Sequence, residues 1–218
     1  MKDILQKKGI KCAIFDLDGT LLDSLGAWEA VDLKFLSDRG VTPDREYVKA
    51  IAHLDFHRTA EYTIQKFGFS DTADELMNEW RRLSVVAYEE EILLKPFAKQ
   101  YLEYLKSRGV KLGVSTSLVE NLSTPCLKRN GIYHLFDAFT VAGGEIRGKE
   151  FPDVYLVTCN KLGCLPEQCA VFEDIAVGAK TARDAGFFSV GVRDEHCLDE
   201  ELLKKSCDFY INCFDEIF

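Results

Sequence analysis

The feature of this sequence that most constrains its fold is a series of six short apolar runs, mostly separated by stretches with helical periodicity. The runs cover residues 11–16, 111–115, 136–141, 169–172, 187–192 and 208–211. They are too short for helices, and their alternation with helical stretches is typical of a parallel sheet whose strands are joined by helices. The sequence therefore predicts an α/β core with a parallel sheet.

The interval between the first two apolar runs contains several helical stretches and no convincing strand. Its last part, residues 71–91, is long, charged and amphipathic. A segment of about 70 residues is adequate for a small helical bundle. We therefore expect a core of residues 1–22 and 95–218, and a helical domain of residues 23–94 inserted after the first strand through two short hinges.

The charge balance excludes some classes of partner. The chain has 36 acidic and 27 basic residues, for a formal net charge of −9, whereas nucleic-acid-binding proteins normally present a basic face. No apolar run approaches the ~20 residues of a membrane span, and the first ten residues lack the features of a signal peptide. We expect a cytoplasmic monomer or weak dimer without nucleic-acid or membrane partners. A small anionic substrate remains compatible with this charge.

Eight cysteines require an explanation of their own. None forms a C-x-x-C pair, and the spacing of Cys159, Cys164 and Cys169 fits neither a zinc knuckle nor a common iron–sulfur pattern. Without a secretory signal, buried thiols normally stay reduced. We therefore expect reduced and mostly buried cysteines.

The sharpest chemical signal is DLDGT at residues 16–20, directly after the first apolar run. A period of two places Asp16 and Asp18 on the same side of an extended chain, and Gly19 permits a tight turn. Ligands bind outside the carboxyl ends of strands in open parallel sheets. Two carboxylates there suit Mg²⁺, or a division into nucleophile and general acid/base. The ordinary alternative is an Asp-Gly turn capped by its own side chain.

Three later segments complete a set of motifs. Residues 115–117 (STS) follow an apolar run, residues 148–153 read GKEFPD, and residues 172–174 read FED. Together with DLDGT, and in this order, they resemble the four motifs of the haloacid dehalogenase superfamily of phosphohydrolases, whose third motif is usually written G-K-P-x-P-D. The resemblance covers essentially the whole chain. It implies a Rossmann-like parallel sheet with helices on both faces.

The resemblance also implies roles for the carboxylates. Asp16 is expected to act as the nucleophile that forms an aspartyl-phosphate. Asp18 is expected to protonate the leaving oxygen and then to activate water, while its backbone carbonyl reaches the metal. Asp16 and Asp174 are expected to hold Mg²⁺, which neutralises developing charge. Glu173 is expected to position a neighbouring lysine or a metal-bound water.

The second and third motifs supply the remaining groups. Thr116, with Ser117 beside it, is expected to bind a phosphoryl oxygen, and Lys149 is expected to place a positive charge against the phosphoryl group and Asp16. Taken singly, these residues would be a helix cap and a solvated loop lysine. Two departures from the motifs stand out: Glu150 occupies a usual proline position, and Ile175 occupies a usual serine position.

The position of the helical insert resembles the branch that has a cap after the first motif, as in β-phosphoglucomutase-like phosphatases. Such a cap would close over the site and contact the substrate. Trp28, His57 and Arg58 are the candidate substrate contacts in the cap. His53 and His57 have the spacing of a metal pair, but the sequence shows no third ligand.

The sequence thus predicts a Mg²⁺-dependent phosphatase acting on a small phosphorylated metabolite, for which a sugar phosphate is the first candidate. A β-phosphoglucomutase-like phosphomutase is the alternative, and it is disfavoured because Trp28 stands where that mutase has a histidine. A dehalogenase would have no task for Asp18. A catalytically inactive binding protein would be expected to lack at least one of Asp16, Asp18, Lys149 and Asp174, yet all are present.

Overall fold

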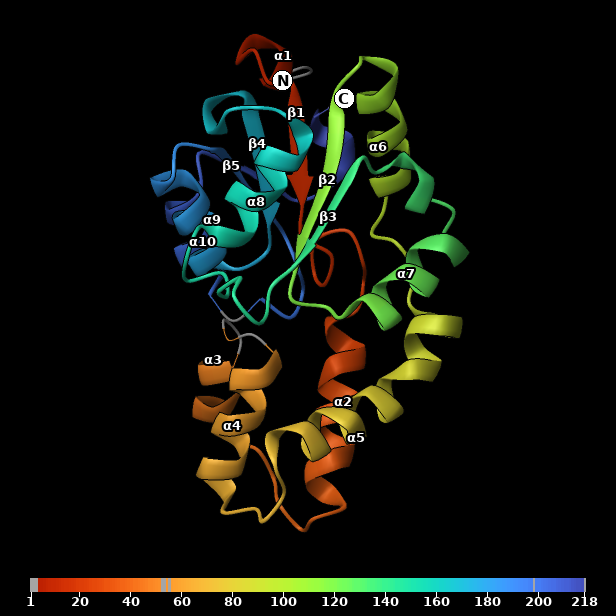
Figure 1. Ribbon diagram of the computed structural model, residues 1–218, viewed down its shortest axis with the longest axis vertical. Helices are drawn as coiled ribbons and strands as arrows, with labels where there is room; N and C mark the ends of the chain where they lie inside the picture. Colours follow the sequence, from red (N-terminus) through yellow and green to blue (C-terminus); the bar gives the residue numbers. More distant parts are fainter. Residues whose placement is uncertain (1–3, 52–53, 55, 198, 218) are drawn as a thin grey trace.

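The computed structural model describes residues 4–51, 54, 56–197 and 199–217. Figure 1 shows a sheet flanked by helices at one end of the molecule and a separate group of helices, built by residues 25–91, at the other. The carboxyl ends of the central strands point toward this second group. In the part of the chain that is described, no helix is long and apolar enough to cross a membrane.

The sheet consists of β1 (Cys12–Phe15), β2 (Lys111–Thr116), β3 (Ala138–Val141), β4 (Cys169–Glu173), β5 (Phe188–Val192) and β6 (Phe209–Ile211). All neighbouring strands pair in parallel, in the order β3-β2-β1-β4-β5-β6. Each apolar run found in the sequence corresponds to one of these strands. The predicted Rossmann-like α/β core is therefore confirmed, because this strand order is that of the dinucleotide-binding fold.

The helices of the core are α1 (Ile4–Lys7), α6 (Ala98–Ser107), α7 (Glu120–Arg129), α8 (Asp153–Leu162), α9 (Ala176–Asp184) and α10 (Glu200–Ser206), with 3₁₀ turns at η2 (Tyr133–Leu135), η3 (Pro166–Gln168) and η4 (Phe214–Ile217). In Figure 1, α6 and α7 lie on one side of the sheet, and α8, α9 and α10 lie on the other. The side chains of β1 alternate between these faces: Phe15 packs with Leu102 and Leu122, whereas Ile14 packs with Tyr155.

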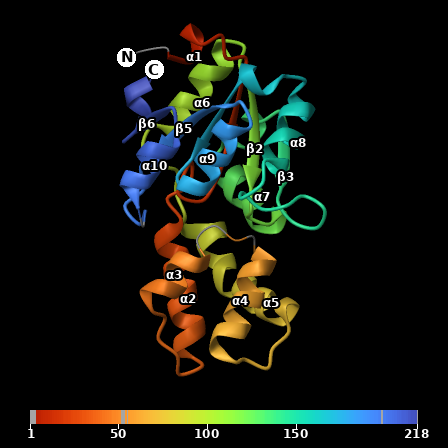
Figure 2. The ribbon, with the colours of Figure 1, turned by 90° about the vertical axis from the view of Figure 1, so that its left-hand side faces the viewer.

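The helical insert comprises α2 (Leu25–Ser37), α3 (Arg45–Ile51), α4 (Phe56–Phe67), α5 (Ala73–Val86) and the π-helical turn η1 (Ala87–Glu91). It has a hydrophobic core of its own, in which Phe35, Tyr47 and Trp80 are almost fully buried. Thr72 begins α5 with a capping box, because its hydroxyl accepts from the Glu75 amide while the Glu75 carboxylate accepts from the Thr72 amide. Figure 2 shows this bundle beyond the end of the sheet.

The two chain segments that connect the insert to the core run side by side. Leu22 and Leu94 form an antiparallel bridge. The amide of Asp23 donates to the carbonyl of Leu93 at 3.0 Å, and the amide of Lys95 donates to the carbonyl of Leu21 at 2.9 Å. The segments therefore meet near both predicted junctions. The division into a core and a domain of residues 23–94 stays a prediction.

The structure differs from the sequence expectation for the cysteines. Cys12 of β1 and Cys164, which follows α8, are joined by a disulfide. Cys159 and Cys169 lie close by, with their sulfur atoms 3.3 Å apart, as free buried thiols. Spacing along the chain could not reveal the pair, because 152 residues separate the two bonded cysteines. The expectation of reduced thiols is therefore wrong for Cys12 and Cys164.

Candidate active site

The site lies where the connections of the sheet change direction. β1 and β4 are neighbours at the centre, while the chain moves outward from β1 to β2 on one side and from β4 to β5 on the other. Ligands of open α/β sheets bind in the crevice at such a point. Asp16 follows β1, and its amide donates to the Phe172 carbonyl of β4 at 3.1 Å. Glu173 ends β4, and Asp174 follows it.

A buried lysine connects these two strand ends. The Nζ of Lys149 lies 2.6 Å from Oδ1 of Asp16 and 2.8 Å from Oε1 of Glu173. The hydroxyl of Tyr155, on α8, donates to Oε1 of Glu173 at 2.7 Å. Burial alone would lower the pKa of Lys149, but Asp16, Glu173 and Asp174 outweigh it and hold that pKa above its ordinary value. Lys149 is therefore a fixed positive charge.

Three carboxylates form a cluster at the same place. Asp16, Glu173 and Asp174 each offer an oxygen, and these oxygens all lie within 4.8 Å of one another. Burial raises the pKa of Asp174, and the charge of Asp16 raises it further. Burial likewise raises the pKa of Glu173, although Lys149 opposes this. Buried oxygen donors that repel one another suit a hard divalent cation such as Mg²⁺, so the residues present fit that ion.

The loop after β1 approaches this cluster closely. Thr20 donates from its hydroxyl to Oδ1 of Asp174 at 3.1 Å. Gly19 has a φ of +74°, and a Cβ built there would lie 2.4 Å from Oδ2 of Asp174. The glycine in DLDGT therefore serves two purposes, since it permits the left-handed turn and leaves room for the Asp174 carboxylate.

The side chain of Asp18 is held apart from the cluster by the two segments that lead to and from the insert. Ser24 donates from its hydroxyl to Oδ1 of Asp18 at 2.6 Å, and the Tyr88 hydroxyl of η1 donates to the same oxygen. Burial raises the pKa of Asp18 to about 6, although both hydrogen bonds oppose this. A carboxyl group in this state is suited to exchange a proton near neutral pH.

The hydroxyl residues at the end of β2 and directly after it point in different directions. Ser115 lies within 2.7 Å of the Thr158 hydroxyl and donates to the Val154 carbonyl, so it faces α8 and the core. Thr116, on the opposite face of the strand, lines the cavity beside Asp16, and its hydroxyl accepts from the Leu118 amide at 3.0 Å. Ser117 lines the same cavity. Thr116 and Ser117 are thus positioned at the site.

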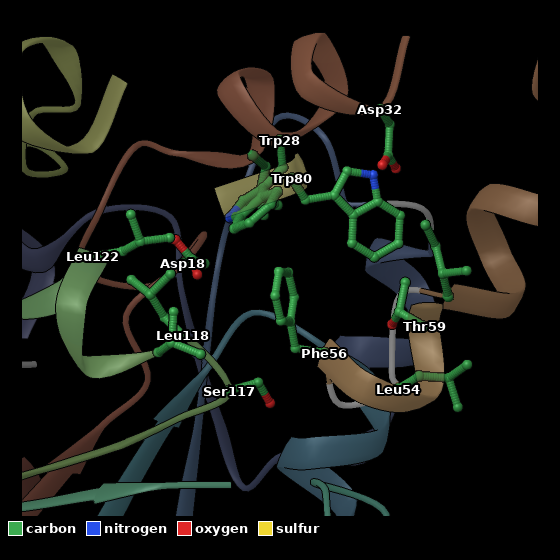
Figure 3. Close-up of a pocket in the computed structure, with 13 residues that line it drawn as sticks. Asp18, Trp28, Asp32, Leu54, Phe56, Thr59, Trp80, Ser117, Leu118 and Leu122 are labelled. Atoms are coloured by element: carbon green, nitrogen blue, oxygen red, sulfur yellow. The ribbon is translucent and has the colours of Figure 1, made fainter. Parts of the chain in front are cut away.

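Two adjoining cavities open at this place. The smaller one, of about 120 Å³, is lined by Asp16, Asp18, Leu25, Leu54, Thr116, Ser117, Lys149, Asp174 and Ile175. The larger one, of about 230 Å³, lies between the core and the insert, and Figure 3 shows the residues around it. The two cavities share Asp18, Leu25, Leu54 and Ser117. Asp18 therefore stands at the boundary between them.

The candidate contacts of the insert lie in different places. Trp28 lines the larger cavity, with its ring 5.9 Å from those of Phe56 and Tyr88. His57 is exposed and pairs with Glu61, and it lines neither cavity. His53 lies outside the described residues.

Arg58 also lines neither cavity, but it joins the insert to the core. Its guanidinium donates to Glu150, the residue that replaces the usual proline of the third motif. This departure from the motif therefore provides an ion pair between the two parts of the molecule. Ile175, the other departure, lines the smaller cavity and precedes α9.

Several residues of the site carry no clear signal in the sequence. Tyr88 and Tyr155 are brought to Asp18 and Glu173 by folding alone, and Asp32 and Trp80 reach the larger cavity from α2 and α5. Thr20, which donates to Asp174, was also missed, although its place in the DLDGT motif could have identified it as a site residue.

Known proteins resemble this chain in sequence and fold. A family model described as haloacid dehalogenase-like hydrolase matches residues 10–186. A validoxylamine A 7'-phosphate phosphatase of Streptomyces hygroscopicus is 29% identical over 90% of this chain and 91% of its own. Hexitol phosphatase A of Escherichia coli is 31% identical over 82% of this chain and 81% of its own. A β-phosphoglucomutase structure from Clostridium difficile, 23% identical, superposes with a TM-score of 0.79, covering 96% and 93% of the two chains.

The fold, the ordered motifs and these similarities place the chain in a class of enzymes, the phosphoric monoester hydrolases. Within that class the chain belongs to the haloacid dehalogenase-like hydrolases, and its fold is that of the β-phosphoglucomutase-like members.

Proposed function

We propose that this enzyme is a Mg²⁺-dependent phosphatase that hydrolyses a small phosphorylated metabolite, with sugar phosphates as the first candidates, through an aspartyl-phosphate at Asp16. The observation that carries the proposal is the separation of two carboxyl groups. Asp16 is bound to Lys149 at 2.6 Å, while Asp18 is turned to Ser24 and Tyr88 and has a pKa raised to about 6. One group is paired with a cation and placed for attack, and the other is suited to carry a proton.

The two proposed steps use the different roles of Asp16 and Asp18. The Asp16 carboxylate attacks phosphorus while Asp18 gives its proton to the departing ester oxygen, so that an alcohol leaves and an acyl phosphate forms. Asp18, now ionised, then takes a proton from water as that water attacks the acyl phosphate, which releases orthophosphate and restores both residues. Thr116 and Lys149 hold phosphoryl oxygens during both steps.

Asp16 and Asp174 are the proposed protein ligands of the metal, together with the backbone carbonyl of Asp18. Glu173 shares the cluster, but its carboxylate already binds Lys149 and Tyr155, so we assign it to positioning Lys149. When bound, Mg²⁺ would reduce the repulsion between Asp16 and the anionic phosphoryl group. The helical insert is proposed to act as a cap that keeps bulk water away from this reaction.

The experiment that tests this function is phosphorus NMR of the purified protein with Mg²⁺ and a panel of sugar phosphates that includes β-glucose 1-phosphate. We expect growth of an orthophosphate signal that Asp16→Asn abolishes. Asp18→Asn is expected to release about one equivalent of p-nitrophenolate from p-nitrophenyl phosphate, because this leaving group needs no proton, and then to stop for lack of a base.

The outcomes separate the alternatives. A new phosphate ester without orthophosphate would show a phosphomutase. Orthophosphate release that survives Asp16→Asn would come from a contaminant and would remove the basis of the proposal. If Asp18→Asn, like Asp16→Asn, released no p-nitrophenolate at all, the separate role of Asp18 would be contradicted.

A further inference from the structure

The larger cavity contains a carboxylate that the proposed mechanism does not use. Asp32 lies one helical turn after Trp28 on α2, so both side chains point to the same side of the helix, and both line the cavity. In the described part of the chain, no hydrogen bond or ion pair reaches the Asp32 side chain. Burial raises its pKa to about 7. A partly buried carboxylate without a partner is unfavourable, so its presence needs a reason.

A second polar group that lines the same cavity is also unsatisfied. The indole Nε1 of Trp80 is buried and finds no hydrogen-bond acceptor among the described residues, and Trp80 as a whole is only 2% exposed. Figure 3 shows the nitrogen-bearing edge of Trp80 turned toward the Asp32 carboxylate. Buried polar groups of native proteins are normally satisfied. The insert thus offers a free acceptor and a free donor at one wall of the cavity.

The hydroxyl of Tyr47, on which the charge of Asp32 acts, is already engaged. Thr63 donates to the Thr59 carbonyl at 2.8 Å, and the Tyr47 hydroxyl lies 3.0 Å from the Thr63 hydroxyl. Because the Thr63 proton is used in this way, Tyr47 gives its own proton to Thr63 and has none for Asp32. Tyr47 therefore leaves the Asp32 carboxylate available to a ligand.

The wall that carries Asp32 belongs to the cavity that adjoins Asp18, the proposed general acid. Asp18, the proposed acid, lines both cavities, so the ester oxygen of a substrate would lie beside Asp18 with its phosphoryl group in the smaller cavity. The rest of the alcohol would extend into the larger cavity toward Asp32. At about 230 Å³ this space is smaller than the ~300–1,000 Å³ typical of drug-sized ligands. It suits a small leaving group.

The chemistry of the lining indicates what that leaving group carries. Of the described residues that line the larger cavity, none is a lysine, arginine or histidine, and three are the aromatic residues Trp28, Phe56 and Trp80. A carboxylate among aromatic faces binds a cation well, because the ion pair and the ring faces both attract positive charge. The indole N–H next to it requires an acceptor such as a hydroxyl oxygen.

We propose that the larger cavity recognises a leaving group with a protonated amine next to a hydroxyl, so that the substrates are phosphate esters of amino alcohols, amino sugar phosphates among them. The amine binds Asp32, and the neighbouring oxygen accepts from Trp80. This inference rests on the proposed phosphatase function and narrows its substrate class.

The test compares esters that differ only in an amine and a hydroxyl. The kcat/KM is measured for glucosamine 6-phosphate against glucose 6-phosphate, and for 3-amino-2-hydroxypropyl phosphate against glycerol 1-phosphate. We expect the wild type to prefer the amine in at least one pair by about tenfold, as for a charge-assisted contact. Asp32→Asn is expected to reduce that ratio to about one, chiefly by lowering kcat/KM for the amine ester.

The matched control is Glu29→Gln. Glu29 also lies on α2, but its carboxylate is 63% exposed and pairs with His196 outside the cavity. This variant should keep the amine preference. Binding is measured separately from turnover as the rise in melting temperature caused by glucosamine or by glucose, and only the wild type and the control should respond preferentially to glucosamine.

Each possible result supports or overturns the inference of amine recognition by Asp32. Hydrolysis that depends on Asp16 but shows no amine preference in either pair would leave the phosphatase function standing and overturn this inference. A preference that survives Asp32→Asn would place amine recognition elsewhere. If no ester is hydrolysed, the proposed function fails. A rise in melting temperature with glucosamine that Asp32→Asn abolishes would then still support the binding site. No rise in melting temperature with glucosamine would refute the site.

Discussion

Asp32, the residue proposed to bind the amine, lowers the stability of the fold at a pH where its carboxyl group would be ionised in the unfolded chain. Its carboxyl group has a pKa of about 7 in the folded chain, raised by burial, against an ordinary value of 3.8. Between these two values the unfolded chain has lost the proton while the folded chain keeps it. The folded state then binds more protons, so the free energy of unfolding falls as the pH rises through this window.

Asp32→Asn should remove this dependence. We expect the variant to gain stability relative to the wild type between pH 4 and pH 8, by at most ~4 kcal/mol, with the gain complete above pH 7. Urea unfolding of both proteins at pH 4 and pH 8 measures the difference in their free energies of unfolding. Any effect of the amide that does not depend on pH is the same at both pH values, so it cancels when the two differences are compared. A constant difference between the two proteins at both pH values would contradict the origin in proton binding.

Individual residues were predicted unevenly from the sequence. Five residues were found because each belongs to a recognisable motif, and the structure places all five around one cavity: Asp16, Asp18, Thr116, Lys149 and Asp174. Their individual roles stay proposals. The partners of these residues belong to helices of other parts of the chain, and no local pattern distinguishes a tyrosine that reaches a carboxylate from one that fills a core.

At the scale of elements, α9 packs against β4 through a glycine. A Cβ built at Gly178 would lie 2.8 Å from the Tyr155 hydroxyl and 2.9 Å from the Glu173 carboxylate. Glu173 binds Lys149, and Tyr155 holds Glu173 by a hydrogen bond, so the absence of a side chain at Gly178 lets a helix approach without displacing the lysine.

Gly178→Ala is therefore expected to destabilise the protein by ~1–3 kcal/mol through overpacking, and to lower kcat by displacing Lys149. Thermal unfolding and steady-state kinetics measure the two effects. Gly26→Ala is the control, because a Cβ at this other helical glycine meets only the exposed tip of His196, at 3.3 Å, and alanine favours a helix. Equal effects of both substitutions would show that the close approach at Gly178 is unimportant.

Most elements were predictable because their residues follow a simple period. The strands were predicted to within one or two residues, and the stretch at residues 71–91 corresponds to α5 and η1. A helix was expected to start after Thr116, but its extent was not predicted, and the observed helix α7 contains Pro125 although proline normally interrupts a helix. The short α10 carries too few residues for a clear period.

For the whole molecule, the disulfide joins the amino-terminal strand to a loop far along the chain. Because it closes a loop across a sequence separation of 152, it removes much conformational freedom from the unfolded state. We expect reduction to lower the free energy of unfolding by ~2–4 kcal/mol, measured in urea with and without dithiothreitol. The double variant Cys12→Ala with Cys164→Ala should be insensitive to the reductant, and a wild type equally insensitive would argue against the bond.

The bridge between Leu22 and Leu94 has a consequence for how such a molecule can evolve. A segment whose two ends touch can be shortened, lengthened or replaced by another while its host keeps its shape. On the proposed mechanism, this segment contacts the leaving group while the host carries the reacting carboxylates. A new substrate could then be accommodated by exchanging one continuous piece of gene, with the residues proposed to break the phosphate bond passed on intact.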